Sequence, residues 1–316
     1  MSVYITITRG IFGGSIPEKQ IRFVNQAAKL GIQQLPLYYY PVASDSDGEL
    51  SSRLDGILSG FSYNDDIILQ MPTLLNEKYD QMLLDKINIF RNESQSKLIM
   101  VVHDIEQDSD IIEEKITNYY NQADVLVLPS ASYGFYLQEH GLKVNKLVYF
   151  QLYDQRTDSL PTPPFTSQVN FLSSSQVNLE LYLDNIKVNH WGNSEHALES
   201  IPYYMNQAGG FGVIIPTESE LFAQKMVPPI NTFQYLSANL PIITITGTEL
   251  AHFITHFNLG MTINDLSEIG KRISQVNIDS YQAMALNIQK IVQAGGFIRE
   301  ALMQAVIMAG LKKIRG

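Results

Sequence analysis

A histidine and a carboxylate stand side by side where an apolar run ends. His103 and Asp104 directly follow the stretch 98–102, in which every residue is apolar. Residues that follow a strand of a parallel sheet lie at the edge where ligands bind. A His–carboxylate pair at that edge either hydrogen-bonds a substrate hydroxyl or carries out acid–base catalysis. The alternative is structural, with Asp104 capping the segment that follows.

A glycine cluster precedes an apolar run in the second half of the chain. Gly209-Gly210-Phe211-Gly212 leads into the segment 213–215. Glycines at this place either let the backbone approach a ligand closely or supply a positive φ in a turn. The spacing is not GxGxxG followed by a helix, which would be typical of a dinucleotide site. The pattern therefore favours a structural turn over a phosphate cradle.

Hydroxyl and carboxylate residues follow that apolar run. Thr217-Glu218-Ser219-Glu220 comes directly after it. Glu218 or Glu220 could accept hydrogen bonds from the two hydroxyls of a ribose, as carboxylates do in nucleotide sites. The same residues also suit the first turn of a helix, where a hydroxyl caps and acidic side chains complement the helix dipole. Both interpretations remain open.

Cations are scarce in this part of the chain. Between residues 157 and 270 the only Lys and Arg residues are Lys187 and Lys225. If a phosphate-bearing ligand binds here, Lys225 is the candidate for its counter-charge, because it stands in the loop region after the Thr-Glu-Ser-Glu segment. The alternative is a solvated surface lysine.

The sequence predicts no metal centre. His252 and His256 have helical i, i+4 spacing, but no Glu follows the first of them and no third ligand is evident. The chain has no Cys, so disulfides and thiolate metal sites are excluded. His190-Trp191 either stacks on a base or packs. No Ser–His–Asp nucleophile elbow, P-loop or kinase signature is present.

Composition excludes several classes of protein. The 316 residues are 45% hydrophobic and 17% charged, with a net charge of −10. A broad nucleic-acid surface would need clustered Lys and Arg, so we expect no nucleic-acid partner. No apolar stretch reaches the roughly 18–20 residues of a membrane span, and the amino terminus does not have the pattern of a signal peptide. We therefore expect a cytoplasmic protein.

Strand and helix patterns alternate through the first half, which predicts a parallel, doubly wound sheet. The predicted strands are 3–8, 34–39, 66–70, 97–103, 125–128 and 147–151. The predicted helices are 17–30, 49–58, 79–90, 110–120 and 133–140.

A proline-rich segment, 157–167, separates this half from a second βα domain. Its predicted strands are 168–172, 179–183, 187–190, 212–215 and 242–245, and its predicted helices are 197–206, 231–238 and 249–257. A helical tail, 279–314, is interrupted at Gly295-Gly296. We expect an α/β chain of two Rossmann-like domains, 1–156 and 157–290, that face a central cleft. The helix in 291–316 should pack back on the first domain or form an oligomer interface.

Several strings carry a family resemblance. They are Tyr4-Ile5-Thr6, 49–57 (ELSSRLDGI), Gln70-Met71-Pro72-Thr73, His103-Asp104, 119–130 (YYNQADVLVLPS), Gly209-Gly210-Phe211-Gly212, Leu240-Pro241-Ile242-Ile243 and Asn258-Leu259-Gly260. In these the chain resembles the nucleotide-sugar-synthetase-like glucosyltransferases that extend O-linked glycans on bacterial serine-rich repeat adhesins. The resemblance covers nearly the whole chain and is stronger in the first half.

This resemblance implies a GT-B fold and a retaining, metal-independent transfer of a hexose, glucose or N-acetylglucosamine, from a UDP-sugar. It further implies that the second domain holds the UDP-sugar and the first an acceptor N-acetylglucosamine on a serine-rich protein. The enzyme would be a cytoplasmic homo-oligomer without a cofactor. His103 and Asp104 would meet acceptor or sugar hydroxyls. The donor would meet Gly13, Gly14, Ser15, Gly210, Thr217, Glu218, Lys225, Asn231 and Thr232.

The chain departs from the family pattern at two cations. Ser173-Ser174-Ser175-Gln176 replaces a loop in which relatives carry an Arg, and Asn231 replaces a Lys. Removing one preorganised donor to a developing negative charge costs roughly 10²–10³ in rate. The chain is therefore either an active transferase, one that uses another donor such as UDP-galactofuranose or UDP-N-acetylglucosamine, or a degenerate paralogue. Such a paralogue would serve as partner subunit or glycopeptide-binding module of an active enzyme.

Overall fold

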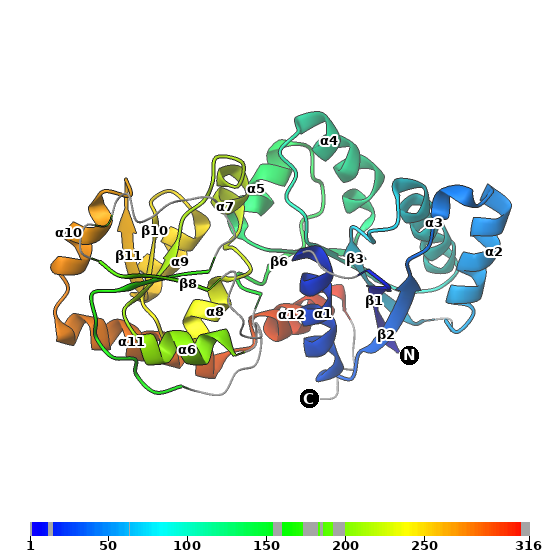
Figure 1. Cartoon of the computed structure of the whole chain (residues 1–316). Coiled ribbons are helices and arrows are strands. Elements are labelled where there is room, and N and C mark those ends of the chain that lie inside the picture. Colours follow the sequence, from blue (N-terminus) through cyan, green and yellow to red (C-terminus); the bar gives the residue numbers. More distant parts are fainter. Residues whose placement is uncertain are drawn as a thin grey trace. The chain divides into compact units, whose positions relative to one another are not determined.

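The chain divides into two compact units. The computed structural model describes residues 2–11, 15–62, 64–153, 160–172, 183, 186–191 and 200–310. Unit 1 comprises residues 1–153 and 296–316, and unit 2 comprises 154–295 (Figure 1). The expected boundaries were 156/157 and 290/291. Each unit contains its own parallel sheet.

Unit 1 is built on a six-stranded parallel sheet with the order β2-β1-β3-β4-β5-β6. All residues of β3, β4 and β5 are buried, as expected for strands with helices on both faces. The strands are β1 (Val3–Arg9), β2 (Gln33–Tyr38), β3 (Asp66–Met71), β4 (Leu98–Val102), β5 (Val125–Leu128) and β6 (Leu147–Tyr149).

Five helices connect these strands: α1 (Ser15–Ala28), α2 (Asp47–Leu58), α3 (Glu77–Glu93), α4 (Ser109–Asn118) and α5 (Ala131–Glu139). Short 3₁₀ turns are η1 (Val42–Ser44) and η2 (Tyr120–Gln122). Side-chain caps fix where the helices begin. Ser46 and Glu49 form a reciprocal capping box at α2, Asn76 caps α3, and Asp108 caps α4 by accepting from two backbone N–H groups.

The last helix, α12 (Phe297–Ala309), belongs to unit 1. It packs against α1 and against β4, β5 and β6, on the face of the sheet opposite α4 and α5 (Figure 1). Ile298, Leu302 and Val306 are fully buried there, whereas Ile307 is 67% exposed. Most of the apolar face of α12, which was expected either to pack on the first domain or to form an oligomer interface, is therefore buried within unit 1. Leu311 lies outside the described residues.

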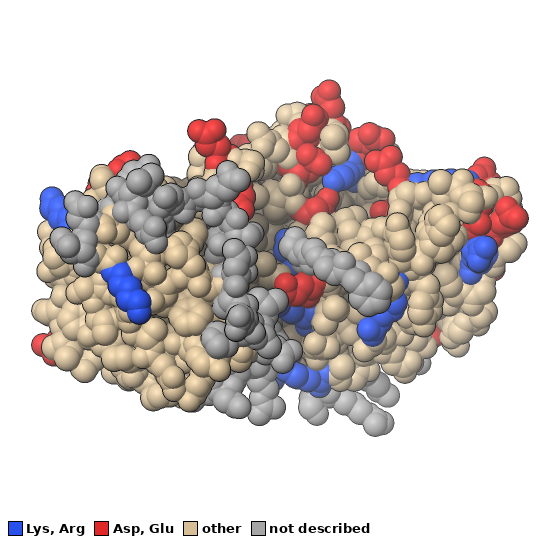
Figure 2. All heavy atoms as spheres, in the orientation of Figure 1, with Lys and Arg blue, Asp and Glu red and all other residues tan. Residues whose placement is uncertain are grey.

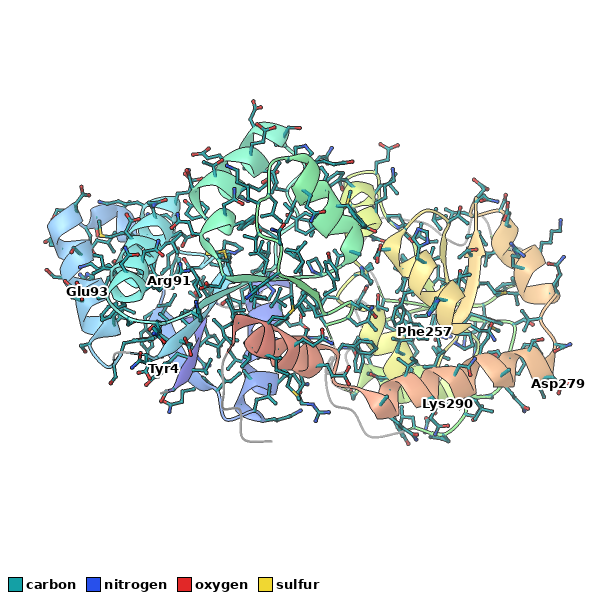
Figure 3. The ribbon with its side chains drawn as sticks, turned by 180° about the vertical axis from the view of Figure 1, so that it is seen from behind. Tyr4, Arg91, Glu93, Phe257, Asp279 and Lys290 are labelled. Carbon is teal, nitrogen blue, oxygen red and sulfur yellow. The ribbon has the colours of Figure 1, made fainter. Side chains whose placement is uncertain are left out.

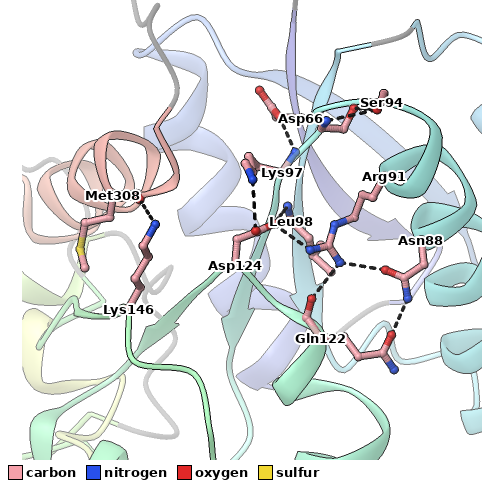
Figure 4. A network of polar contacts seen from close by, with 11 residues as sticks. Asp66, Asn88, Arg91, Ser94, Lys97, Leu98, Gln122, Asp124, Lys146 and Met308 are labelled. Atoms are coloured by element: carbon pink, nitrogen blue, oxygen red, sulfur yellow. Dashed lines mark hydrogen bonds and ion pairs between the residues drawn. The ribbon is translucent and has the colours of Figure 1, made fainter.

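The amino-terminal edge of the unit 1 sheet carries a network of ion pairs (Figure 4). The Asp124 carboxylate, just before β5, meets Arg91 at 2.8 Å and Lys97 at 3.5 Å and accepts from the Leu98 N–H at 2.9 Å. Asp66 accepts from the Lys97 N–H at 2.6 Å. Burial raises the pKa of Asp66 to about 6, against the lowering effect of that hydrogen bond. This edge fastens β3, β4, β5 and α3 together.

Unit 2 is built on a five-stranded parallel sheet with the order β11-β10-β9-β7-β8. The strands are β7 (Val169–Phe171), β8 (Val188–His190), β9 (Phe211–Ile214), β10 (Ile242–Ile245) and β11 (Gly260–Ile263). The helices are α6 (Ile201–Ala208), α7 (Leu221–Met226), α8 (Thr232–Ser237), α9 (Glu249–Phe257), α10 (Glu268–Ser274) and α11 (Ile278–Ala294), and Figure 3 labels Asp279 and Lys290 on α11. Sequence patterns did not predict β11, α7 or α10. The strand expected at 179–183 lies outside the described residues except for Leu183.

The core of unit 2 lies between its sheet and α10 and α11. It contains Phe171, Phe211, Ile243, Ile263 and Tyr281, all almost fully buried. No single helix in the described ranges is long and apolar enough to cross a membrane, and the consecutive helices α11 and α12 meet that test only when joined.

Candidate functional site

His103 follows β4 and is completely buried. Its Nε2 lies 2.8 Å from the Gln70 Oε1, and its Nδ1 lies 3.4 Å from the Tyr153 hydroxyl. Because an amide oxygen can only accept, Nε2 carries the proton and Nδ1 accepts from Tyr153. Burial, and then the charge of Lys19, holds the pKa of His103 well below its usual range. In this structure the ring is a neutral, internally bonded group rather than one that faces a ligand.

Asp104, the next residue, is partly exposed, and its environment differs from the buried environment of His103. Its Oδ2 accepts from the Lys115 ammonium at 2.7 Å, and the buried Tyr120 hydroxyl donates a further hydrogen bond to this carboxylate, which raises the Tyr120 pKa after the larger effects of burial and of the Asp104 charge. It does not cap α4, because Asp108 does so. Sequence reasoning placed both residues at the sheet edge but could not separate their environments.

Lys115 joins the two acidic residues that follow β4. Its ammonium lies 2.7 Å from Asp104 and 3.3 Å from Glu106. Burial alone would lower the pKa of Lys115, but the charges of the two carboxylates raise it above its ordinary value. The lysine is therefore committed to these partners and is not free to hold an anion.

A pocket of about 320 Å³ lies beside Asp104, entirely within unit 1. Its walls are Met71 with the loop 72–76, the first turn of α3, one side of α4 and the pair Tyr119-Tyr120. Its volume is at the lower end of the range for small-molecule sites. Leu74 in this loop has a φ of 69°, a conformation that is costly for a branched side chain.

The pocket is rich in carboxylates. Glu77, Asp80, Asp104 and Glu114 line it, against the single cation Lys115. Figure 2 shows acidic side chains gathered over α4. Burial raises the pKa of Asp80 to about 6, against hydrogen bonds from Thr73 that lower it. The sequence did not predict this pocket.

Lys19, in the first turns of α1, is a further titratable group that sequence reasoning missed. Its ammonium donates to the His103 carbonyl oxygen at 3.0 Å and lies 5.1 Å from the centre of the Tyr153 ring. Burial lowers the pKa of Lys19 to about 8, although the charge of Asp104 opposes this. A lone lysine in an amphipathic helix gives no sequence signal for such a position.

The loop after β1 is not placed. Gly13 and Gly14 lie outside the described residues, and Ser15 begins α1 with its side chain outside them. Ser173-Ser174-Ser175-Gln176 also lies outside them. The expected donor contacts from these segments therefore stay predictions.

In unit 2 the glycine cluster is explained by packing. Gly209 and Gly210 have φ values of 73° and 77°. A Cβ on Gly210 would lie 2.1 Å from the Gln168 carbonyl oxygen, and one on Gly212 would lie 2.4 Å from the Tyr235 ring. The Gly210 N–H and C=O already bond within the unit, the latter accepting from Tyr281 at 2.9 Å. These contacts agree with the structural turn.

The Thr-Glu-Ser-Glu segment directly precedes α7, and Glu220 is the N-cap residue of that helix. The Glu220 carboxylate accepts from the Thr217 N–H at 3.0 Å, and the Thr217 hydroxyl lies 3.1 Å from that of Ser219. Glu218 is exposed. Lys225, in the last turn of α7, is also exposed and has no ion-pair partner in the described ranges.

Asn231 and Thr232 begin α8 near the end of β7. The Asn231 amide donates to the Leu172 carbonyl oxygen at 3.4 Å, which brings the start of α8 to this strand end. Its Oδ1, the Thr232 hydroxyl and the Gln224 Oε1 are buried without hydrogen-bond partners in the part of the chain that the structure describes. Sequence reasoning named Asn231 and Thr232 and missed Gln224. Buried polar atoms in this state are candidates for ligand contacts.

The described histidines other than His103 do not gather with other ligands into a metal site. The Trp191 indole N–H donates to Asn170 Oδ1 at 3.0 Å, which is a packing role. Within the described ranges no three His, Asp or Glu side chains gather as metal ligands do.

Comparison with known proteins identifies both halves of the chain. Residues 3–152 match the family model for the N-terminal domain of glucosyltransferase 3-like proteins, and residues 163–305 match the model for their C-terminal domain. Glucosyltransferase 3 of Streptococcus parasanguinis is 28% identical over 335 residues, covering 98% of this chain and 99% of the relative. Glucosyltransferase 3 of Streptococcus gordonii is also 28% identical, covering 97% and 99%.

Solved structures share the fold at low identity. Sucrose-phosphate synthase from Thermosynechococcus elongatus matches with a TM-score of 0.62 at 10% identity, covering 98% of each chain. An α-glucosyltransferase in complex with UDP matches with a TM-score of 0.60 at 12% identity, covering 98% and 100%. HepE from Anabaena, in complex with UDP and glucose, matches with a TM-score of 0.58 at 11% identity, covering 97% and 99%. With its two parallel-sheet units the chain has the GT-B fold of glycosyltransferases, and it belongs to the glucosyltransferase 3-like family.

Proposed function

We propose that this protein transfers a hexose, glucose or N-acetylglucosamine, from a UDP-sugar to an N-acetylglucosamine-bearing serine-rich repeat protein. The observation that carries the proposal is the family match, which spans both units, together with relatives named glucosyltransferase 3 that align end to end. Structural neighbours that were solved with UDP or with UDP and glucose support a UDP-sugar as donor.

The donor is proposed to bind unit 2 at the end of β7. Asn231 and Thr232 supply buried polar atoms there that lack hydrogen-bond partners among the described residues, and Gln224 of α7 supplies a third such atom. A hydroxyl, a carboxamide oxygen and neighbouring backbone groups are suited to the donors and acceptors of a nucleotide. Gly210, Thr217, Glu218 and Lys225, with Gly13, Gly14 and Ser15 of unit 1, remain the further donor contacts that we propose.

We propose a retaining reaction on the front face of the sugar, with no metal and no cofactor. The acceptor oxygen forms a bond to the anomeric carbon as the bond from that carbon to the UDP phosphate oxygen breaks. The acceptor proton passes to the leaving phosphate oxygen, so the protein needs no nucleophile. Its task is to stabilise the charge that develops on the diphosphate, and Lys225 is the cation proposed for it.

Titration calorimetry of the full-length protein with UDP tests the donor site. We expect saturable binding, and Lys225→Ala should abolish it at millimolar UDP. Lys187→Ala is the matched control, since Lys187 is the other exposed cation between residues 157 and 270. An unchanged affinity in Lys225→Ala would remove this lysine from the site, and an absence of binding in the unchanged protein would contradict the donor proposal.

The missing cations favour one alternative function. Ser173-Ser174-Ser175-Gln176 and Asn231 stand where the family resemblance implies an Arg and a Lys. A protein that bound no UDP but retained glycopeptide binding would be a partner subunit or recognition module of an active transferase. The calorimetric experiment separates the two functions, because only the transferase needs the nucleotide.

Assembly and location are proposed from the family resemblance alone. We propose a homo-oligomer that acts in the cytoplasm before its acceptor is exported. Sedimentation equilibrium of the purified chain tests the first part, and a monomer at micromolar concentration would contradict it.

A further inference from the structure

The strands β1 and β3 are neighbours in the unit 1 sheet, but they share ladder hydrogen bonds over only part of their length. Their ladder joins residues 3–5 to residues 66–68. Along its other side β1 pairs with β2 through residues 4–9. The chain runs from β1 to β2 on one side and then to β3 on the other, so the strand order reverses between β1 and β3. Ligands of open parallel sheets bind outside such a point.

Side chains replace the ladder where β1 and β3 approach the carboxyl-terminal edge. Gln70 of β3 donates from its backbone N–H to the Thr6 hydroxyl oxygen at 2.8 Å and from its carboxamide to the Thr6 carbonyl oxygen at 2.5 Å. Gln20 of α1 forms the next connection. Its Oε1 accepts from the Thr8 N–H at 3.1 Å, and its Nε2 donates to the Pro72 carbonyl oxygen at 2.9 Å. One carboxamide therefore bridges the end of β1 to the first residue after β3.

The Gln20 carboxamide is held in one orientation. The residue is only 1% exposed, and it follows Lys19 in the first half of α1. Because a carbonyl oxygen can only accept and a backbone N–H can only donate, the two partners fix which end of the carboxamide faces which strand. The backbone carbonyl oxygen of Gln20 also accepts from the Gln70 carboxamide, at 3.4 Å. A buried polar group that is bonded on both sides rigidifies the segments that it joins.

The segment that Gln20 holds on the β3 side is the loop 72–76. Pro72 and Leu74 of this loop line the unit 1 pocket, whereas Gln20 does not. The Thr8 hydroxyl donates to the Thr73 carbonyl oxygen, so a second bond from the end of β1 reaches the same loop. Gln20 therefore acts on the wall of the pocket from behind.

We infer that Gln20 is a positioning residue for the transfer reaction, because its carboxamide sets the loop 72–76 against the end of β1. It touches no substrate and acts through the backbone of Thr8 and Pro72. The inference rests on the proposed function in one respect, since its consequence is measured in the rate of hexose transfer. All the groups involved belong to unit 1, so the arrangement of the two units does not enter.

Two substitutions of Gln20 separate positioning from packing. Gln20→Met keeps a similar volume but removes both the donor and the acceptor. Gln20→Glu retains both when its carboxyl group is protonated, since the O–H can donate to Pro72 and the C=O can accept from Thr8. When ionised it has no donor and turns a charge toward the Pro72 carbonyl oxygen. Burial favours the protonated form as the pH falls.

Hexose transfer from UDP-glucose or UDP-N-acetylglucosamine to an N-acetylglucosamine-bearing peptide is measured for the full-length proteins between pH 8 and 6. We expect kcat at pH 8 to fall about tenfold or more in both variants, because small displacements of a site lower rates to this degree. The ratio of Gln20→Glu to the unchanged protein should rise at least about threefold by pH 6, and Gln20→Met should not recover. Lys19, Asp80 and His103 titrate in every variant, so the ratio at each pH removes their effect.

Gln26→Met is the matched control. Gln26 is a buried glutamine on the same helix, and its carboxamide oxygen accepts from the Lys29 ammonium at 2.9 Å. Its substitution should leave kcat within about twofold, because no loop at the carboxyl-terminal edge depends on it. A merely structural role of Gln20 would lower the free energy of unfolding without changing the rate per folded molecule.

Equal kcat in Gln20→Met and the unchanged protein would overturn the inference, as would a Gln20→Glu protein that transfers no faster than Gln20→Met at pH 6. If Gln20→Met does not fold, the ratio for Gln20→Glu decides alone, and a ratio that does not rise overturns the inference.

Hydrogen exchange without substrate distinguishes failure of the inference from failure of the proposed function. The Leu75 N–H in the loop 72–76 donates to the Thr73 hydroxyl oxygen at 3.4 Å. Amides of this loop should exchange about tenfold faster in Gln20→Met, or in Gln20→Glu at pH 8, than in Gln26→Met. If the unchanged protein transfers no hexose, the proposed function fails and exchange alone tests Gln20. Exchange that is equal in all the proteins would then overturn the inference.

Discussion

The two edges of the unit 1 sheet differ in how their charges are compensated. At the amino-terminal edge, Asp124 meets two cations and a backbone N–H (Figure 4). At the carboxyl-terminal edge, Asp104 has one cation, Lys115, which it shares with Glu106, and it borders a pocket lined by three further carboxylate residues. A carboxylate held by several donors stabilises a fold, whereas a carboxylate that shares one cation and borders a pocket is suited to a ligand. The comparison assigns stability to the first edge and binding to the second.

The largest effect on stability is expected at the amino-terminal edge. Asp124→Ala removes the partner of Arg91, Lys97 and the Leu98 N–H, and leaves these donors half-buried. We expect the free energy of unfolding to fall by about 2–4 kcal/mol. Urea denaturation measures it. Asp85→Ala, an exposed carboxylate bonded to Gln81, should change it by less than about 0.5 kcal/mol.

His103 lies at the carboxyl-terminal edge, yet its contacts are those of a structural residue. His103→Ala leaves a cavity and an unpaired Gln70 carboxamide oxygen, so we expect the free energy of unfolding to fall by about 2–3 kcal/mol near neutral pH. Because the folded pKa is depressed, the native ring stays neutral below pH 6.5 while the unfolded chain takes up a proton. The unchanged protein should therefore lose up to about 1.4 kcal/mol per pH unit below 6.5 from this group.

Urea denaturation of both proteins between pH 7.5 and 5 measures this contribution. The loss due to His103→Ala should shrink as the pH falls, because the variant lacks the group. A loss that stays constant over this range would mean that the native ring is protonated, and His103 would then be a candidate for acid–base work.

Asp66 allows the opposite pH dependence to be tested. Its folded pKa is raised to about 6, so its contribution is fully present below about pH 4 and is lost as the pH rises through 6. Asp66→Asn retains an acceptor for the Lys97 N–H but removes the desolvated charge. We expect the variant to gain about 1 kcal/mol relative to the unchanged protein on going from pH 5 to 7.5. Urea denaturation of both proteins at pH 5 and at pH 7.5 measures this gain. An equal change in the free energy of unfolding for the two proteins would contradict the prediction.

The smallest effect on stability is expected for Asp104→Asn. It weakens one partly exposed ion pair and relieves a buried oxygen of its charge, so the free energy of unfolding should change by less than about 1 kcal/mol. The same substitution should weaken sugar binding strongly. A stability loss as large as that of Asp124→Ala would show that the two edges do not differ in kind.

Much of the fold could be predicted because its signals are local. The apolar runs at 125–128 and 242–245 and the helix pattern at 249–257 coincide with β5, β10 and α9. The element β11 was missed because three of its four residues are only half-buried and it begins with Gly260, so its pattern is not that of a buried strand. The helices α7 and α10 are six and seven residues long, too short for a helical period to stand out.

The candidate site was only partly predictable. Chain order places His103 and Asp104 at the sheet edge. Only the folded structure shows that His103 is buried against Gln70 and Tyr153, whereas Asp104 lines a pocket. That pocket draws on residues from Met71 to Tyr120, and no sequence spacing connects them. The cap of α4 is Asp108 rather than Asp104, a choice set by where the helix begins.

The most direct measurement of the central claim is mass spectrometry of an N-acetylglucosamine-bearing serine-rich peptide incubated with the purified protein and a UDP-hexose. We expect a mass increase of one hexose that requires the UDP-sugar and is strongly reduced in Asp104→Asn, but not in Glu113→Gln, which changes an exposed carboxylate on α4. If the folded protein leaves the peptide mass unchanged, first with UDP-glucose and then with UDP-N-acetylglucosamine, the proposed transferase function is contradicted.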